Sequence, residues 1–544
     1  MRGLMQHDPL ILTRFLERAA AYFPEGSVQT YELDAGLAAE SYAELGERAR
    51  RLASALGGLG VAPGDRVATF ARNSARHLEL YFGVPGTGAV LHTLNVRLHP
   101  DQVAWIAEHA GDRVAFVDAS LLDAFEAVRP SLPSLETVVV MDDLGHVPAV
   151  RADADYEELL RSGDPGFPWP DLPEDEAALL CYTSGTTGRP KGVLYSHRAL
   201  VLHAFMVNQA EVIGLTSSDV VLPVVPMFHA NGWGFPHAAT LAGAAQVFTG
   251  RAGADPHVVG ELVQTCRVTV AAGVPTVWID LLRHLETCPH DLSSIRMIKS
   301  GGAALPPSLV QSYDERHGVR VVQGWGMTET SPLAAIASAA DALSPGERWR
   351  ALSRGGRPVP GIRTRVVDEL GADTPWDDAG MGELLVRGNW VAEGYFRGEE
   401  DPGTAATSSP GPSGGWLRTG DVAVVDASGS IRLTDRTKDL VKSGGEWIST
   451  IELESALMGH PAVLESAVVA APHERWQERP VAFVVVRPGT TATADELLAF
   501  LAPRFAKWWL PDEILFVSEI PKTSVGKFDK RALRDRVRDR PAPE

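Results

Sequence analysis

The stretch CYTSGTTGRPKGV, residues 181–193, gathers four Ser/Thr hydroxyls, three glycines and two cationic side chains into thirteen positions. Glycines let backbone N–H groups approach an anion closely, while hydroxyls and the ammonium group of Lys191 can donate to phosphate oxygens. The segment therefore predicts a polyphosphate-binding loop. It is not the loop of a P-loop NTPase, because that motif requires Gly-Lys-Ser/Thr, whereas Lys191 lies between Pro190 and Gly192. On this segment alone, a plain Ser/Thr/Gly-rich turn remains a competing interpretation.

Five further segments carry chemistry-bearing residues and follow the first in order. They are GGAALP (301–306), QGWGMTETSP (323–332), LRTGD (417–421), DRTKDLVKSGGEWIS (435–449) and PKTSVGKFDKRALR (521–534). Together the six segments resemble the adenylate-forming enzymes, a superfamily of acyl-CoA synthetases, luciferases and adenylation domains of peptide synthetases. The stretches PMFHANGWG, KWWLPDEILF and EIPKTSVGKF are most similar to those of medium- and long-chain fatty acyl-CoA synthetases.

The resemblance implies an AMP-forming acid–thiol ligase that uses ATP, Mg²⁺ and coenzyme A. In that family the carboxylate of an acid attacks the α-phosphate of ATP, which gives an acyl-adenylate and pyrophosphate. The thiol of coenzyme A then displaces AMP. Because a carboxylate and a triphosphate bring negative charges together, catalysis needs cations and oriented donors where the charge gathers. The expected substrate is a medium- or long-chain fatty acid.

The resemblance also implies a set of nucleotide-binding residues. Those expected on the departing β- and γ-phosphates are Thr183, Ser184, Gly185, Thr186, Thr187, Gly188 and Lys191. Those expected around the rest of the nucleotide are Gly302, Ala303, Ala304, Gln323, Gly324, Trp325, Gly326, Met327, Thr328, Glu329, Asp421, Arg436 and Lys438. Trp325, where the family commonly has Tyr, would stack on adenine, and Asp421 would accept both ribose hydroxyls. Thr183 and Glu329 would hold Mg²⁺.

Lys527 is the cation expected to join the acyl carboxylate and the α-phosphate. By resemblance it reaches in from a small C-terminal domain, and Lys438 lies at the hinge about which this domain rotates. The other orientation would bring Lys442 and Trp447 towards the nucleotide for the transfer to coenzyme A. An exposed lysine and a packed tryptophan remain the structural alternative for this last pair.

The stretch PMFHANGWG supplies the expected acyl pocket. His229 would close the channel beside the carboxylate, Ala230 would line the pocket, and Trp233 would act as a gate that swings when ATP binds. A core position remains an alternative for both rings. The residues expected to be catalytic are Lys527, Glu329, Thr183 and His229.

These segments must be positioned by more than one hydrophobic core, because the chain has 544 residues. Short apolar runs such as AALLCY (177–182) alternate with amphipathic stretches, which predicts parallel sheets covered by helices. We expect an α/β fold with a large N-terminal domain of helix-covered sheets and a β-barrel-like subdomain (1–434). A small, mobile α+β domain (435–544) is expected to carry the catalytic lysine as a lid.

Charge and apolar content exclude several classes of partner. A net charge of −19 opposes binding to nucleic acid or anionic lipid. No apolar run reaches the roughly 18–20 residues that span a bilayer, and a signal-peptide pattern is absent, so a cytoplasmic protein is expected. Cys181, Cys266 and Cys288 lack metal-type spacing, and each is expected to be a small buried apolar residue. A homodimer is suggested by similarity alone.

Several alternatives stay open at this point. The acid could be an aryl or another carboxylic acid, although PMFHANGWG lacks the acidic residue with which amino-acid-activating relatives bind an α-amino group. The adenylate could be passed to a free carrier protein instead of coenzyme A. The chain could also be a nucleotide-binding regulator without turnover. The acyl chain length, the oligomeric state and the pathway are not encoded in any motif.

Overall fold

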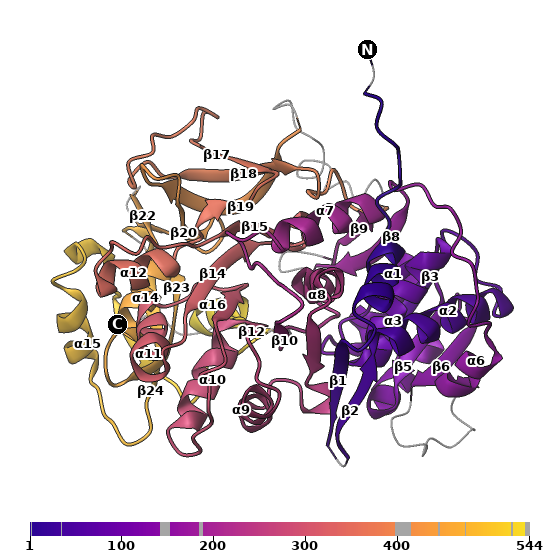
Figure 1. The fold of residues 1–544 in the computed structure, drawn as a ribbon. Helices are drawn as coiled ribbons and strands as arrows, with labels where there is room; N and C mark the ends of the chain where they lie inside the picture. Colours follow the sequence, from indigo (N-terminus) through magenta and orange to yellow (C-terminus); the bar gives the residue numbers. More distant parts are fainter. Residues whose placement is uncertain are drawn as a thin grey trace.

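The structure, a computed structural model, describes residues 1, 3–33, 35–141, 153–183, 189–397, 415–443, 446–473, 475–523 and 526–538. The predictions made for Ser184, Gly185, Thr186, Thr187 and Gly188 lie outside these residues. Within them, the chain forms two helix-covered sheets, a smaller antiparallel sheet and a C-terminal α+β unit (Figure 1). This architecture confirms the expected fold class.

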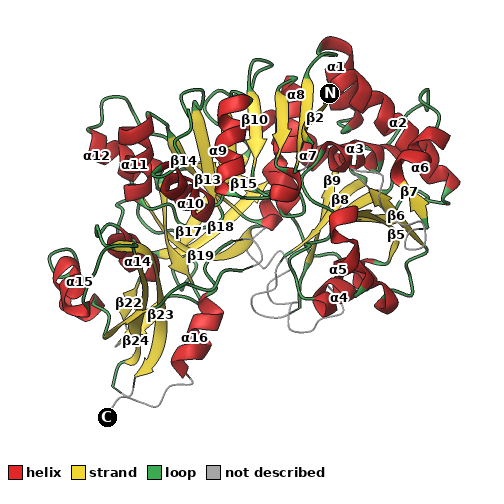
Figure 2. Cartoon of the chain, turned by 90° about the horizontal axis from the view of Figure 1, so that it is seen from below, coloured by secondary structure: helices red, strands yellow, loops and turns green. Residues whose placement is uncertain are grey.

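The first sheet has seven strands and is parallel except at one edge. Its order is β7 (Ala154–Asp155), β6 (Thr137–Met141), β5 (Asp112–Asp118), β3 (Arg66–Phe70), β4 (Val90–Thr93), β8 (Ala177–Tyr182) and β9 (Gly192–Ser196). Only β9 runs antiparallel to its neighbour. Helices lie on both sides (Figure 2), namely α2 (Tyr42–Gly58), α3 (Ala75–Gly83) and α6 (Tyr156–Ser162), and α4 (Pro100–Ala110) and α5 (Leu122–Glu126).

Side-chain alternation along β3 shows why both faces of this sheet are covered. Val67 belongs to the largest core cluster, with residues of α2 and α3, whereas Ala68 and Phe70 belong to a second cluster with residues of α4 and α5. Successive strand residues point to opposite faces. An uninterrupted apolar strand therefore needs helices on both sides, as its sequence predicts.

The second sheet has nine strands and carries most of the site. Its order is β16 (Arg357–Pro358), β15 (Leu333–Ile336), β14 (Val321–Gly326), β13 (Met297–Gly301), β12 (Val270–Gly273), β10 (Val220–Pro223), β11 (Ala245–Phe248), β1 (Ser27–Glu32) and β2 (Gly36–Ser41). The strands from β14 to β1 are parallel, and the flanking pairs are antiparallel. The remaining helices of the large domain are α1 (Thr13–Tyr22), α7 (His197–Val207), α8 (Phe235–Ala242), α9 (Pro256–Thr265), α10 (Pro275–Leu285), α11 (Pro307–His317) and α12 (Pro345–Leu352).

The part expected to be barrel-like is a four-stranded antiparallel sheet. It consists of β17 (Ile362–Val367), β18 (Gly382–Gly388), β19 (Leu417–Val425) and β20 (Ile431–Arg436). The predicted domain boundary after residue 434 falls inside β20, because that strand stays paired with β19 as far as Arg436. The division at this residue stays a prediction.

The C-terminal unit forms a separate small core. Its sheet contains β22 (Glu446–Ile448), β21 (Val441–Ser443), β24 (Gln477–Val486), β23 (Val463–His473) and β25 (Glu513–Phe516). One face packs against α14 (Thr450–Met458) and α15 (Ala494–Leu501), and the other packs against α16 (Lys530–Arg538) through Leu533. In the part of the chain that the structure describes, no helix is both long and apolar enough to cross a membrane.

Candidate active site

The GGAALP and QGWGMTET segments meet at the carboxyl ends of two neighbouring parallel strands. Gly301 ends β13 and is paired in register with Gly324 of β14. The carboxyl edge of parallel strands is where open α/β sheets bind their ligands. The turn Thr328–Thr330 follows β14 directly and brings Glu329 to the same edge. The two segments therefore lie next to each other at this edge, and their role as one nucleotide site stays a prediction.

The glycines in these segments allow close approaches that a larger residue would block. A Cβ at Gly301 would lie 2.8 Å from the Gly324 carbonyl oxygen and 3.0 Å from Nζ of Lys299. Gly302 has a φ of +80°, and a Cβ there would lie 3.1 Å from Cε of Lys527. Glycine is the residue that tolerates both the left-handed backbone and this crowding. These residues leave room for the Lys527 side chain at the edge of the sheet.

Lys527 reaches this edge from the C-terminal unit. Its turn is fixed by two hydrogen bonds, in which the Thr523 N–H donates to the Lys527 carbonyl (2.6 Å) and the Lys527 N–H donates to the Thr523 hydroxyl (3.2 Å). The Thr276 hydroxyl at the start of α10 donates to the Gly526 carbonyl (3.1 Å), which ties the turn to the large domain. The described structure therefore brings the lysine from one domain into contact with the other.

The GGEW stretch forms a hairpin within the C-terminal unit. Lys442 of β21 is paired with Trp447 of β22, and its ammonium nitrogen lies 5.2 Å from the centre of the indole ring. Lys442 is exposed, while Lys527 lies against Gly302. This is the arrangement expected for adenylate formation, in which Lys527 is inserted. A role for Lys442 and Trp447 with coenzyme A stays a prediction.

Asp421 is held from two sides. The Trp325 indole N–H donates to Oδ2 of Asp421 (2.8 Å), and Nε of Arg436 lies 3.2 Å from Oδ1. A carboxylate has about four acceptor positions, so both oxygens keep capacity for the two hydroxyls of a ribose. The indole N–H of Trp325 thus orients the aspartate, and stacking of its ring on adenine stays a prediction. Lys438 follows Arg436 closely and is exposed.

The side-chain amide of Gln323 is a second group that suits a bound nucleotide. Its Nε2 donates to the Ala303 carbonyl (3.1 Å), whereas its Oε1 is buried and has no hydrogen-bond partner among the described residues. A buried acceptor without a partner costs free energy. The exocyclic amine of adenine is a donor that would satisfy it, so the residues present fit an adenine beside Ala303 and Trp325.

Glu329 and Lys191 are connected through Tyr395, a residue that the sequence reasoning missed. The Tyr395 hydroxyl donates to Oε1 of Glu329 (2.7 Å), and Nζ of Lys191 lies 4.8 Å from the centre of the Tyr395 ring. Burial and the negative charge of Glu329 raise the pKa of Tyr395, which keeps the hydroxyl protonated as a donor. The aromatic pair in EGYF (393–396) was the available signal.

The base of the predicted phosphate loop lies beside this group. The Thr183 N–H donates to the Lys191 carbonyl (2.9 Å), and the Lys191 N–H donates to the Thr183 hydroxyl (3.3 Å). These bonds extend the pairing of β8 with β9 as far as Thr183 and Lys191. The Phe396 N–H donates to the Gly192 carbonyl (2.8 Å) and the Ala392 N–H to the Glu329 carbonyl (2.8 Å). Carboxylate and hydroxyl oxygens are the donors that Mg²⁺ prefers, so Glu329 and Thr183 suit this ion.

His229, predicted to close the acyl channel, is a half-buried residue near enough to Lys527 to feel its charge. Burial, followed by the positive charges of Lys527 and Arg97, lowers the pKa of His229 to about 3, so its ring is neutral at physiological pH. The next residues have unusual backbone angles, with φ of 43° at Ala230 and 57° at Trp233. Non-glycine residues adopt such angles at a cost, and they concentrate at functional sites.

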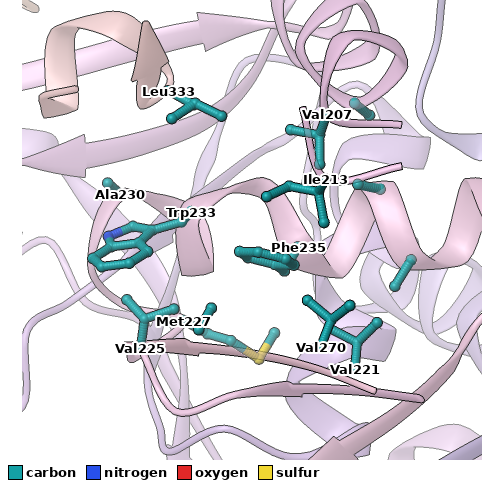
Figure 3. Close-up of a cluster of buried hydrophobic side chains, with 14 of the residues drawn as sticks. Val207, Ile213, Val221, Val225, Met227, Ala230, Trp233, Phe235, Val270 and Leu333 are labelled. Carbon is teal, nitrogen blue, oxygen red and sulfur yellow. The ribbon is translucent and has the colours of Figure 1, made fainter. Parts of the chain in front are cut away.

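Trp233 packs at the edge of the large core. Figure 3 shows its indole beside Ala230, with Leu333 above and Val225 below, and the side chain is 5% exposed. This position agrees with the core alternative. It also places the ring close to Gly301, since a Cβ there would lie 3.5 Å from the indole. The gating motion stays a prediction.

Lys299 is a second residue that the sequence reasoning missed. It lies on β13 and is 4% exposed, and its ammonium nitrogen lies 3.9 Å from the centre of the Trp233 ring. Among the described residues we find no ion pair or hydrogen bond of this ammonium group. Burial lowers the pKa of Lys299 to about 7. The signal was a cation inside the otherwise apolar and small strand MIKSG (297–301).

Comparisons with known proteins agree with this geometry over nearly the whole chain. The model of the AMP-binding enzyme family matches residues 16–396, and that of the AMP-binding enzyme C-terminal domain matches residues 452–527. A long-chain-fatty-acid–CoA ligase of Thermus thermophilus is 48% identical, with 98% of this chain and 97% of that protein covered. A 3-methylmercaptopropionyl-CoA ligase of Ruegeria pomeroyi is 43% identical, with 99% of both covered.

The solved structures give the same answer for the fold. The crystal structure of an anthranilate CoA ligase in complex with anthranoyl-AMP superposes with a TM-score of 0.86 at 28% identity, and 98% of each chain is covered. The similarity therefore includes both the large domain and the C-terminal unit.

Proposed function

Because the chain belongs to the AMP-binding enzyme family and is an AMP-forming acid–CoA ligase, we propose that it activates a medium- or long-chain fatty acid. The observation that carries the reaction is the insertion of Lys527 against Gly302, beside the neutral His229. The aliphatic acid is supported by the 48% identity to a long-chain-fatty-acid–CoA ligase and by an acyl side that contains Trp233 and no acidic residue in PMFHANGWG.

In the first half-reaction the Lys527 ammonium group would lie between the attacking carboxylate and the α-phosphate. Both carry negative charge, so a desolvated cation lowers the energy of the transition state more than it lowers that of the separated reactants. Lys191 and the Thr183 loop would hold the β- and γ-phosphates as they leave. Glu329 and Thr183 would hold Mg²⁺, which supplies charge neutralisation when bound. Asp421 would fix the ribose, so that the phosphorus stays aligned.

The second half-reaction requires Lys527 to leave. The C-terminal unit contacts the large domain through the Thr276–Gly526 hydrogen bond, through the Ser449 hydroxyl, which donates to the Thr434 carbonyl, and through the Arg432–Glu452 ion pair. We propose that rotation at Lys438 withdraws Lys527 and brings the Lys442–Trp447 hairpin to the nucleotide, where it guides coenzyme A. The thiol then attacks the acyl carbonyl and AMP leaves.

The first half-reaction is expected to depend on pH through Lys527. Burial, and then the nearby Arg436, lowers the pKa of Lys527 to about 8, although Asp421 and Glu329 act in the opposite direction. The protonated form stabilises the transition state, so the single-turnover rate constant of adenylate formation should fall as pH rises through about 8. The measurement is pyrophosphate release without coenzyme A between about pH 6 and 10. Lys527→Arg, which stays charged, should show no such fall, and a native profile that stays level to about pH 10 would contradict the assignment.

One observation favours a second candidate substrate. The buried Lys299 ammonium group places a hydrogen-bond donor beside Trp233, where a purely aliphatic chain offers no acceptor. An acid with a heteroatom, such as the 3-methylmercaptopropionate of the Ruegeria pomeroyi relative, is therefore the alternative. Initial rates of acyl-CoA formation with acetate, benzoate, 3-methylmercaptopropionate, octanoate and palmitate separate the two. Highest kcat/KM with octanoate or palmitate supports the proposal, and highest kcat/KM with benzoate or the thioether acid overturns it.

Replacing Lys299 by methionine tests the polarity of the acyl side directly. Methionine has a similar length and no charge, so the substitution removes the ammonium group and keeps the volume. The ratio of kcat/KM for octanoate to that for 3-methylmercaptopropionate should rise about tenfold, the effect of one hydrogen bond. Lys507→Met, at an exposed lysine of the C-terminal unit, should leave the ratio unchanged. If the ratio were also unchanged in Lys299→Met, Lys299 would have a structural role and no role in substrate selection.

A further inference from the structure

A cluster of three histidines and one cysteine lies outside the site described above. His257, His284, Cys288 and His290 each offer one ligand atom, and these atoms all lie within 4.8 Å of one another. His257 belongs to α9, His284 lies near the end of α10, and the other two follow in the loop after α10. The two helices lie side by side (Figure 1). Cys288 is half-buried, not the small buried apolar residue expected from the sequence.

The three imidazole rings form a triangle. Their centres are 5.5 Å apart for His257 and His284, 5.6 Å for His257 and His290, and 5.6 Å for His284 and His290. The Cys288 sulfur lies 3.7 Å from Nε2 of His290.

One nitrogen of the cluster lacks a partner. Nε2 of His284 is buried and makes no hydrogen bond to any described residue. Buried polar atoms in folded proteins are nearly always satisfied, so such an atom indicates a group that binds there. The ring of His284 belongs to the cluster whose four ligand atoms all lie within 4.8 Å of one another, and each of these atoms can bind a metal ion.

The local sequence builds this arrangement. The Cys288 N–H donates to the His284 carbonyl (2.9 Å), which continues the helical turn and sets the two side chains one turn apart on the same side. Asp255 caps α9 by accepting from the His257 N–H (3.0 Å). Gly260 lies in the interior of α9, where glycine is unfavourable, yet a Cβ there would lie 2.6 Å from the His290 ring. The glycine makes room for a ligand.

We propose that His257, His284, Cys288 and His290 bind one Zn²⁺ ion. Imidazole and thiolate ligands are those of zinc sites, whereas Ca²⁺ and Mg²⁺ require oxygen ligands that this cluster does not contain. Bond lengths of about 2.0–2.3 Å place tetrahedral zinc ligands about 3.3–3.8 Å apart, which the Cys288–His290 pair already matches. The exposed His257 can move inward to complete the site. Four protein ligands leave no open position, so the ion is structural.

The zinc ion would stabilise the position of a helix and would not contact the reacting atoms. The first turn of α10 holds Thr276, which contacts the Lys527 turn, and the cluster lies at the other end of this helix. Eleven residues of α-helix span about 16 Å. Zinc joins α9 to the end of α10 and thereby fixes the helix on which the Lys527 turn docks.

The test uses the full-length protein after removal of metal with a chelator. Co²⁺ is added as a spectroscopic probe, because a thiolate–Co²⁺ charge-transfer band appears only when a cysteine sulfur is a ligand. Zn²⁺ is then used to displace it, and bound zinc is counted by mass spectrometry after gel filtration. We expect one zinc per chain and a thermal unfolding midpoint that rises with Zn²⁺.

Three variants make the outcome specific. Cys288→Ser should lose the charge-transfer band, whereas Cys266→Ser, at a half-buried cysteine outside the cluster, should keep it. His257→Ala removes an exposed side chain, so it should fold normally and bind Zn²⁺ at least about tenfold more weakly. The proposal would be overturned if the native protein bound neither Co²⁺ nor Zn²⁺. It would also be overturned if Cys288→Ser and His257→Ala bound these ions as tightly as the native protein does. Neither result depends on which acid the enzyme activates.

Discussion

Lys527→Ala should slow adenylate formation at least about 10³-fold, while transfer from supplied acyl-adenylate to coenzyme A changes less than about tenfold. The ammonium group lies at the edge of the sheet next to Gly302 and is tied there by the Thr276–Gly526 hydrogen bond. It can therefore act on the α-phosphate only in this orientation of the C-terminal unit. The second half-reaction uses the other orientation, in which Lys527 has left. Pyrophosphate release and acyl-CoA formation from synthetic acyl-adenylate measure the two steps separately.

A lysine in the same segment provides a matched control. Lys522 is paired with Glu465 at 2.8 Å, and both residues belong to the C-terminal unit. Lys522→Ala should leave both half-reactions within about threefold of the native rates, as expected for a partly exposed ion pair. If Lys527→Ala slowed both half-reactions equally, Lys527 would contribute to the fold of the C-terminal unit and not to adenylation.

Glu329→Gln should lower the rate of adenylate formation about 10²–10³-fold and raise the Mg²⁺ concentration that gives half of the maximal rate. Glutamine has the same shape and can still accept from Tyr395, so the change removes the negative charge and little else. The expected loss follows from the charge, because a carboxylate binds a divalent cation far better than an amide does. Initial rates of pyrophosphate release over a range of Mg²⁺ concentrations measure it.

Tyr395→Phe separates the charge of Glu329 from its orientation. This variant keeps the carboxylate and removes the 2.7 Å hydrogen bond that holds it. We expect a loss of about tenfold, the value of one hydrogen bond to a charged group, with a smaller change in Mg²⁺ dependence. A loss in Glu329→Gln no larger than that in Tyr395→Phe, with unchanged Mg²⁺ dependence, would show that Glu329 does not bind the ion.

The fold and the position of the main motifs could be predicted because their signals are local. An apolar run such as AALLCY predicts a buried strand from its own residues alone, and β8 spans those residues. Gly301 ends β13 and is paired with Gly324 in the last part of β14, so their segments meet at one edge as a consequence of the parallel sheet. The domain boundary predicted after residue 434 falls within β20 and stays a prediction.

The residues missed by sequence reasoning depend on contacts between distant segments. Tyr395 lies 66 residues after Glu329 and becomes part of the site only through its hydroxyl. Lys299 lies in a strand, and the strand pattern of the sequence does not reveal that Gly301 and Gly324 make room for its side chain. His257 lies on a different helix from His284, so no linear spacing connects it to Cys288 and His290. The Trp325–Asp421 hydrogen bond likewise joins residues 96 positions apart.

The site is expected to adenylate a fatty acid and then to transfer the acyl group to coenzyme A. The most direct test is to identify every product formed from ATP and octanoate, with and without coenzyme A. With the thiol, we predict AMP, pyrophosphate and octanoyl-CoA in equal amounts. Without it, we predict pyrophosphate and octanoyl-AMP that stays bound. Formation of ADP and phosphate, or an octanoyl-AMP that coenzyme A cannot discharge, would contradict the account.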